Sequence, residues 1–178
     1  MHVERMGMAA GSPDLAALID EHYAGLYRYG YRLSGRSADA EDLVQDTFRR
    51  AVGQIHQLRN PSLAKAWLYR ILRNGYLQRV RDDQKRKTVS LDAMSDADSA
   101  GQHGADEPLT IDPAELQAAL DELDESFRTP VILFYFEEFS YKEIADQLGV
   151  PIGTVMSRLA RAKAYLRGKL AKYEPTMP

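Results

Sequence analysis

The chain has 178 residues, a hydrophobic fraction of 44% and a formal net charge of −3. This composition is sufficient for a folded core and argues against wholesale disorder, and the length allows one ordinary domain or two small ones. The sequence contains no cysteine, which excludes disulfides and thiolate metal sites and fits a reducing cytosol.

Membrane insertion and export are disfavoured by the sequence. No apolar run approaches the roughly 20 residues that a helix needs to cross a bilayer. Residues 1–14 lack the apolar stretch of a signal peptide. We therefore expect a cytoplasmic protein.

Charged residues are arranged in blocks along the chain. Residues 49–87 contain eleven basic and two acidic residues, and residues 142–172 contain seven basic and two acidic residues. Between these blocks, residues 88–126 contain eleven acidic residues and no basic one. Local basic patches can bind nucleic acid even in a chain that is acidic overall. A solvated helix face is the alternative for any single block.

Helical spacing of apolar residues predicts three helices in the N-terminal half. The first covers residues 13–34, and Gly35 suits the position after its end. The second covers residues 37–55, with Ser37 or Asp39 as its cap. Its apolar stripe comprises Leu43, Val44, Phe48, Ala51, Val52 and Ile55.

A loop at residues 56–62 precedes the third predicted helix, which covers about residues 63–81. Its apolar positions are Leu63, Trp67, Leu68, Ile71, Leu72 and Leu77. Three helices with short connections can bury one shared core.

Residues 82–112 have few large apolar side chains and no periodicity, so we expect a mobile or extended linker. A loop of this length inside one compact domain would be unusual. The sequence therefore predicts an all-α protein with two small helical domains joined by a flexible acidic linker. The predicted boundaries are 13–82 for the first domain, 83–112 for the linker and 113–172 for the second domain.

Four helices are predicted in the second domain. Pro113 starts the first, and the second follows from about Ser126. The segment from Ser140 to Glu143 matches a capping box, with serine at the cap and glutamate three residues later. The segment from Gly149 to Pro151 breaks that short helix, and the last helix covers about residues 152–171.

The short helix, the turn at Gly149 and the longer basic helix match a helix-turn-helix. The inward stripe is Val155, Leu159, Ala162 and Leu166. The outward face, which would enter the major groove, comprises Thr154, Met156, Ser157, Arg158, Ala160 and Arg161. Arginine can pair with guanine, serine can bond phosphate or base, and Met and Ala can touch a thymine methyl group. An ordinary basic helical hairpin is the alternative, which the co-occurrence of cap, glycine turn and basic helix disfavours.

Residues 140–170 resemble the promoter-binding C-terminal domain of sigma factors, and the preceding LDELDESFRTPVILFYFEEFSYKEIA resembles the lead-in to it. In the N-terminal half, AEDLVQDTFRRAV is similar to the family's polymerase-binding helix and AWLYRILRN to its promoter-melting helix. The resemblance covers about residues 14–172 and indicates the compact, two-domain extracytoplasmic-function group. The motif KEIADQLGVPIGTVMSRLARAK is most similar to the oxidative-stress-type members of that group.

The resemblance implies binding to core RNA polymerase and promoter DNA, with no cofactor and no metal. Core polymerase would dock on the polar face of the second helix, at Asp42, Gln45, Asp46 and Arg49. The minus-ten element would meet a base pocket and a basic face made of Leu58, Arg59, Asn60, Pro61, Ser62, Arg70, Arg73 and Asn74, together with Arg79 and Arg81. Unstacking a base costs a few kcal/mol, so a fitted pocket is required. An anti-sigma factor would cover both domains.

Several alternatives stay open. Trp67 lies on the apolar stripe and is expected in the core, although a stacking role is the alternative for it and for Tyr69. The acidic linker could mimic RNA by charge or serve only as a tether. Some relatives carry a basic residue where this chain has Met156, so the minus-thirty-five sequence that it reads is open.

Three other classes of protein compete with a sigma factor. A purely protein-binding helical adaptor is disfavoured by the two basic blocks. A helix-turn-helix regulator would bind DNA but not core polymerase. An enzyme is disfavoured because the four histidines (His2, His22, His56 and His103) are scattered without partners at metal or triad spacing, and no glycine-rich phosphate loop is present.

Overall fold

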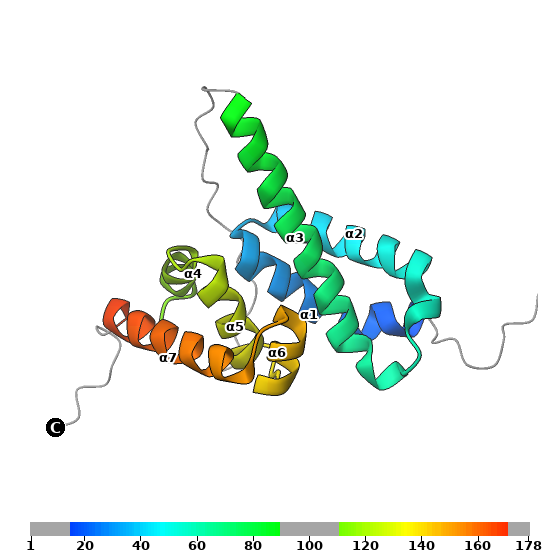
Figure 1. Ribbon diagram of the computed structural model, residues 1–178. Coiled ribbons are helices and arrows are strands. Elements are labelled where there is room, and N and C mark those ends of the chain that lie inside the picture. The colour runs from blue at the N-terminus through cyan, green and yellow to red at the C-terminus, as the bar shows by residue number, and fades with distance from the viewer. Residues whose placement is uncertain (1–14, 90–110, 171–178) are drawn as a thin grey trace, which may run out of the picture.

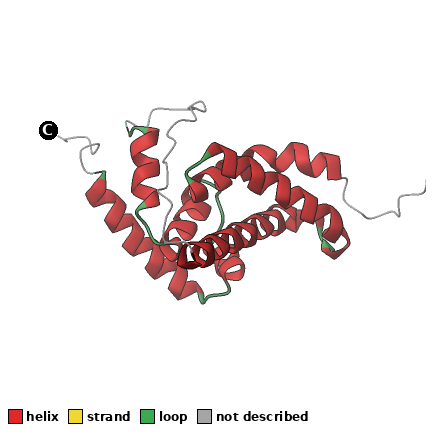
Figure 2. Cartoon of the chain, turned by 90° about the horizontal axis from the view of Figure 1, so that it is seen from above, coloured by secondary structure: helices red, strands yellow, loops and turns green. Residues whose placement is uncertain are grey.

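The computed structural model describes residues 15–89 and 111–170, and every regular element in these two ranges is helical (Figures 1 and 2). We call residues 15–89 the N-terminal unit and residues 111–170 the C-terminal unit. The N-terminal unit contains α1 (Leu15–Ser34), α2 (Ser37–Gln54), 3-10 turns at Ile55–Gln57 and Pro61–Leu63, and α3 (Ala64–Val89). The C-terminal unit contains α4 (Pro113–Asp121), α5 (Glu125–Tyr135), α6 (Tyr141–Leu148) and α7 (Ile152–Lys169).

The junction between α1 and α2 is built on Gly35. Its φ of 72° is left-handed, and its N–H donates to the carbonyl oxygen of Tyr31 at 2.7 Å. The backbone then becomes extended at Arg36, which is the N-cap of α2 and makes no side-chain cap bond. The prediction that Ser37 or Asp39 caps this helix is therefore wrong, because the glycine turn lets the helix begin at Ser37 itself.

Helix α3 is longer than predicted. It extends to Val89, and Figure 1 shows its C-terminal turns reaching beyond the other helices. The Gln78 side chain donates to both carboxylate oxygens of Asp82, at 3.0 and 3.1 Å, which supports this continuation. The prediction of a linker is thus wrong for residues 83–89, whose Lys, Arg and Gln residues favour a helix. Residues 90–110 of the predicted linker lie outside the described residues, and Asp112 at its end caps α4.

The core of the N-terminal unit forms where α1, α2 and α3 meet. Gly30 lets α1 approach α2 closely, since an added Cβ would lie 3.4 Å from the Cα of Ala40. Trp67 is half-buried and packs against this core, as expected. Val52 and Leu63 are exceptions to the predicted apolar stripes, because 54% and 56% of their surfaces are exposed. The fully buried side chains include Leu26, Leu33, Leu43, Val44, Leu68 and Leu72.

The C-terminal unit follows its sequence signals closely. The capping box is confirmed, because the Ser140 N–H donates to the Glu143 carboxylate at 2.9 Å and the Glu143 N–H donates to the Ser140 hydroxyl at 3.3 Å. Gly149 ends α6 with a left-handed φ of 65°. Val155, Leu159 and Ala162 of α7 are buried, as the stripe predicts.

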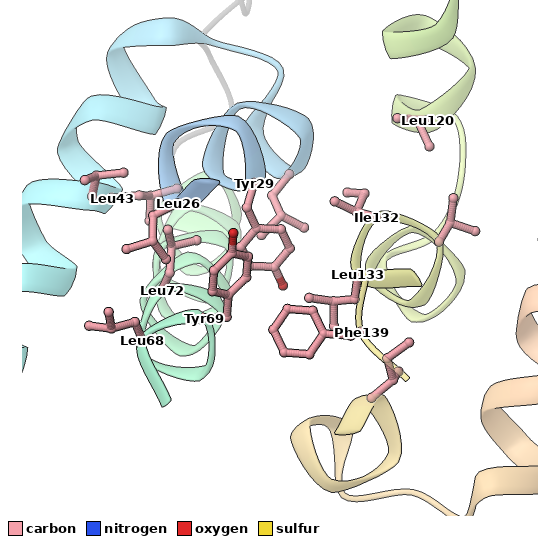
Figure 3. Close-up of a cluster of buried hydrophobic side chains, with 14 of the residues drawn as sticks. Leu26, Tyr29, Leu43, Leu68, Tyr69, Leu72, Leu120, Ile132, Leu133 and Phe139 are labelled. Atoms are coloured by element: carbon pink, nitrogen blue, oxygen red, sulfur yellow. The ribbon is translucent and has the colours of Figure 1, made fainter. Parts of the chain in front are cut away.

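The two units pack against each other, which the sequence patterns did not predict. The Tyr69 ring of α3 lies 5.2 Å from the Phe139 ring, between centroids, and stacks on Tyr29 of α1 at 5.0 Å. Figure 3 shows the Tyr29 and Tyr69 rings facing Phe139 and Leu133 of the C-terminal unit. The buried residues of both units therefore form one continuous hydrophobic cluster.

Candidate nucleic-acid interface

Helix α7 presents the predicted recognition face to solvent. Met156 is 51% exposed, and Ser157, Ala160 and Arg161 are exposed beside it. Thr154 and Arg158 are half-buried at the edges of the same face. The structure therefore brings the six predicted residues together on one side of the helix.

The start of α7 adds an exposed apolar residue, Ile152, that the sequence analysis did not single out. Ile152 is 44% exposed and lies one turn before Met156, so the two form an apolar strip. The Ser157 hydroxyl donates to the Thr154 carbonyl at 3.0 Å and leaves its own lone pairs toward solvent. Pro151 caps the helix without a side-chain bond, so the first N–H groups of α7 can meet an anion.

The polar face of α2 has three exposed members. Asp42, Gln45 and Arg49 point to solvent, whereas the Asp46 side chain is only 14% exposed. Asp46 accepts from Arg49 and pairs with Arg50 at 2.8 Å. Burial opposes ionisation of Asp46, but these two arginines outweigh it and hold the pKa of the carboxyl below its ordinary value.

Val52 lies beside the polar face of α2 and is exposed, although the sequence pattern predicts it in the apolar stripe of this helix. It follows Arg49 by three positions, so both side chains lie on adjacent parts of the helix surface. The sequence held this signal, because three-residue spacing from Arg49 places Val52 beside the polar face.

The loop before α3 is held by Asn60. Its side-chain oxygen accepts from the Ser62 N–H at 3.0 Å and from the Ser62 hydroxyl at 2.9 Å. Arg59 and Pro61 are exposed. Leu58 is 7% exposed and packs with Leu18 and Ala64, so its side chain belongs to a small core cluster under the loop.

Asn74 is exposed on α3. It lies ten residues after the start of α3 at Ala64, which corresponds to about 15 Å along the helix.

The arginines of α3 divide into two groups. Arg70 and Arg81 are exposed, and Arg79 lies 3.9 Å from Asp42 of α2. Arg73 instead faces the C-terminal unit, where its Nη2 donates to the Glu125 carboxylate at 3.1 Å. The predicted basic face is therefore continuous for only part of its length.

Within residues 15–89 and 111–170, no group of three histidine, aspartate or glutamate side chains is placed to hold a metal ion. None of the helices described in these ranges combines the length and apolar character that a bilayer crossing requires.

A helix-turn-helix with an open recognition face, joined to a basic three-helix unit, is the arrangement of a DNA-binding transcription factor. Residues 18–86 match the model of sigma-70 region 2, and residues 114–166 match that of sigma-70 region 4. The chain belongs to the extracytoplasmic-function (ECF) sigma factors of the sigma-70 family. Members of this family bind core RNA polymerase and direct transcription initiation at promoters.

Curated relatives cover both units. The ECF sigma factor SigE of Mycolicibacterium smegmatis is 39% identical over 172 residues, which is 94% of this chain and 65% of the relative. SigV of Bacillus subtilis is 32% identical over 89% of this chain and 92% of its own length. SigL of Mycobacterium tuberculosis is 36% identical over 89% of this chain and 90% of its own length.

A solved structure shares the arrangement of the two units. The sigma factor RpoE of Bartonella quintana, in a co-crystal structure with the anti-sigma factor NepR, superposes with a TM-score of 0.78 at 31% identity. The superposition covers 89% of this chain and 97% of that chain, so it includes both units.

Proposed function

We propose that the N-terminal domain, residues 13–82, binds core polymerase and the minus-ten element, and that the C-terminal domain, residues 113–172, binds the minus-thirty-five element. The observation that carries this proposal is the exposed recognition face of α7 in a chain that matches both sigma-70 regions. The protein works in the cytoplasm as a DNA-binding factor and not as an enzyme.

Duplex DNA would meet the N-terminal half of α7. Arg161 and Arg158 supply bidentate donors, Ser157 supplies a hydroxyl group, and Met156 supplies an apolar contact for a thymine methyl group. The absence of a basic side chain at Met156 favours a site with a thymine at that position. The exposed N–H groups at the helix start would hold a backbone phosphate.

Core polymerase would dock on α2. Asp42, Gln45 and Arg49 provide polar contacts, and Val52 provides the apolar contact at the edge of the same face. The Asp46 carboxylate pairs with Arg49 and Arg50 and so holds these two side chains in place on the helix surface. Protein interfaces of this kind combine a small apolar centre with a polar rim.

The minus-ten strand would follow the exposed side of α3 and the loop before it. Arg59, Asn60, Pro61 and Ser62 form the loop contacts, with Asn60 acting mainly to hold the loop in shape. Arg70, Asn74 and Arg81 then supply donors for the single strand and its phosphates. Arg73 would join them once it is released from Glu125.

An anti-sigma factor is a further proposed partner. The support is the similarity of the two-unit arrangement to RpoE, whose structure was solved with NepR. The α7 motif also supports membership in the oxidative-stress-type subgroup, which is proposed on sequence grounds alone.

Run-off transcription with purified core polymerase tests the proposal. We expect initiation at a subset of genomic promoters only when the protein is added. If the protein binds duplex DNA but neither binds core polymerase nor directs initiation, it is a helix-turn-helix regulator instead. The substitution Asp42→Arg should reduce core binding while leaving duplex binding unchanged.

A further inference from the structure

The contact between the two units hides part of the proposed strand-binding surface. Only 16% of the Arg73 side chain is exposed, and its guanidinium donates to Glu125 at the start of α5. One turn later in α5, Thr129 donates to the same Glu125 oxygen at 2.9 Å and fixes the carboxylate. A carboxylate is thus held where a DNA phosphate would otherwise meet Arg73.

Other cross-unit bonds lie on both sides of this pair. Gln147 of α6 donates to the Ala66 carbonyl of α3 at 3.1 Å. At the opposite end, Arg128 donates to the Leu33 carbonyl at 3.0 Å and so covers the C-terminal end of α1. The Arg73–Glu125 pair therefore lies within a contact that extends over α1 and α3.

The contact also gathers polar atoms that have no protein partner. Four buried side-chain atoms within residues 15–89 and 111–170 lack a hydrogen-bond partner. They are Tyr29 Oη, Arg73 Nε, Glu137 Oε1 and Gln147 Oε1. The Arg73, Glu137 and Gln147 side chains each make a hydrogen bond across the junction of the two units, and Tyr29 stacks on Tyr69 beside it.

Polar side chains at this contact lose hydration when the units close, which offsets part of the gain from apolar burial. The aromatic packing of Tyr69 and Phe139 favours closure. The two effects oppose each other at one contact. A contact of this composition is suited to reversible opening, unlike a fully satisfied core.

Promoter binding demands such opening. Elements centred near positions −10 and −35 lie about 25 base pairs apart, which is roughly 85 Å of duplex at 3.4 Å per base pair. A compact body of this chain length has a radius of gyration of roughly 15 Å. The closed arrangement cannot reach both elements at once.

We propose that the closed form is self-inhibited and that Glu125 acts as an internal substitute for a DNA phosphate by occupying Arg73. Opening frees Arg73 at the same time as it separates the two DNA-binding units. The part that concerns DNA rests on the proposed role of α3 in strand binding. The part that concerns closure rests on the contact alone.

Two engineered cysteines can report closure, because the chain has none of its own. Ala38→Cys on α2 and Ala164→Cys on α7 are at exposed positions in different units. Single-molecule energy transfer between dyes on these sites should show mainly the closed form in the free protein. A distribution dominated by separated units would overturn the proposal.

The variants Arg73→Gln, Glu125→Gln and the double variant form a cycle that isolates the pair. Each single change should lower the closed-to-open ratio roughly fivefold, and the double change should lower it little further. Glu125 also stands in the first turn of α5, so its change could act on the helix alone. In that case Glu125→Gln would change the closed-to-open ratio equally with and without Arg73. Such additive effects would overturn the proposal.

A single-strand probe separates the two parts of the inference. With a fluorescent oligothymidylate of about 12 nucleotides, Glu125→Gln should bind roughly fivefold more tightly than the parent chain, and Arg73→Gln more weakly. If the energy-transfer cycle shows coupling but Arg73→Gln binds the probe normally, the proposed DNA role of Arg73 fails and the closure contact stands. If Glu125→Gln leaves both readouts unchanged, the inhibitory contact is refuted.

Discussion

The Tyr69 hydroxyl donates a hydrogen bond of 2.6 Å to Oε2 of Glu137, across the junction of the two units. Both side chains are almost fully buried, at 2% and 3% exposure. Lys65 adds a second link, since its ammonium group donates to the Glu137 backbone carbonyl at 2.6 Å. A carboxylate in this position is tolerated because polar and basic groups surround it.

Removal of the Tyr69 hydroxyl should weaken the closed form. We expect Tyr69→Phe to lower the free energy of unfolding by about 1–3 kcal/mol, because Glu137 would be left buried without a donor. Urea denaturation followed by circular dichroism measures the effect. Tyr23→Phe is the matched control, since Tyr23 is 46% exposed and should change little. Equal losses in the two variants would contradict the role given to the hydrogen bond.

Closure should also depend on pH through Glu137. Burial raises the pKa of this carboxyl above its ordinary value, although the Tyr69 hydrogen bond and the charges of Arg28, Arg32 and Lys65 lower it in part. The closed state therefore binds the proton more tightly than the open state. Closure should be strongest below the ordinary carboxyl pKa and should weaken as the pH rises through the raised value.

The closed fraction measured by energy transfer between about pH 4.5 and pH 8 tests this dependence. Glu137→Gln, which stays neutral, should remove the part of the slope that Glu137 causes. A slope of the same size in Glu137→Gln would assign the dependence to another group.

Gly25 is expected to be intolerant of a side chain. A Cβ at this position would lie 2.5 Å from the Tyr69 hydroxyl oxygen, which its bond to Glu137 holds in place. Gly25→Ala should therefore destabilise the fold by about 1–3 kcal/mol. Gly53→Ala is the control in α2, because an added Cβ there meets nothing within 4 Å. That control should stabilise the helix by up to about 1 kcal/mol, and thermal unfolding of both variants gives the comparison.

Local signals in the sequence predicted the elements of the fold well. The capping box at Ser140 and the turn at Gly149 determine their own helix ends within a few residues, so periodicity and caps suffice. The burial of Val155 follows from the same short-range pattern. These features require no knowledge of the other unit.

Contacts between the units could not be predicted in this way. The pairing of Arg73 with Glu125 joins residues 52 positions apart, and a one-dimensional pattern shows only that Arg73 is polar. The sequence predicts Leu58 in a DNA-binding loop and Val52 in an apolar stripe, whereas the structure buries Leu58 and exposes Val52. The reason is similar. Which apolar side chain is covered depends on how α1 and the 3-10 turns pack, and not on helical spacing alone.

The α2 face gives a prediction about core polymerase. Val52→Asp should weaken core binding by roughly tenfold or more, because it places a charge in the apolar part of the proposed contact. Stability should be unchanged, since Val52 is 54% exposed. Gln54→Asp introduces the same charge on another side of α2 and serves as the control. Fluorescence anisotropy with labelled protein measures both affinities, and equal effects would argue against a specific face.

Arg161 on α7 gives a prediction about promoter duplex. Its side chain is exposed on the recognition face, and loss of a bidentate base contact costs about 1–3 kcal/mol. Arg161→Ala should therefore weaken binding to a minus-thirty-five duplex by roughly 5- to 100-fold and leave core binding intact. Lys163→Ala is the control, because Lys163 is also basic and exposed but points about 160° away around the helix.

Salt dependence separates a base contact from a phosphate contact for Arg161. A base contact should lower affinity most for the preferred sequence, whereas a phosphate contact should weaken all duplexes alike and reduce the salt slope by about one. We expect the first pattern for Arg161→Ala and a smaller, sequence-independent effect for Lys163→Ala. Equal losses on specific and random duplex would place Arg161 on the backbone, and the base contacts would then fall to Met156, Ser157 and Ala160.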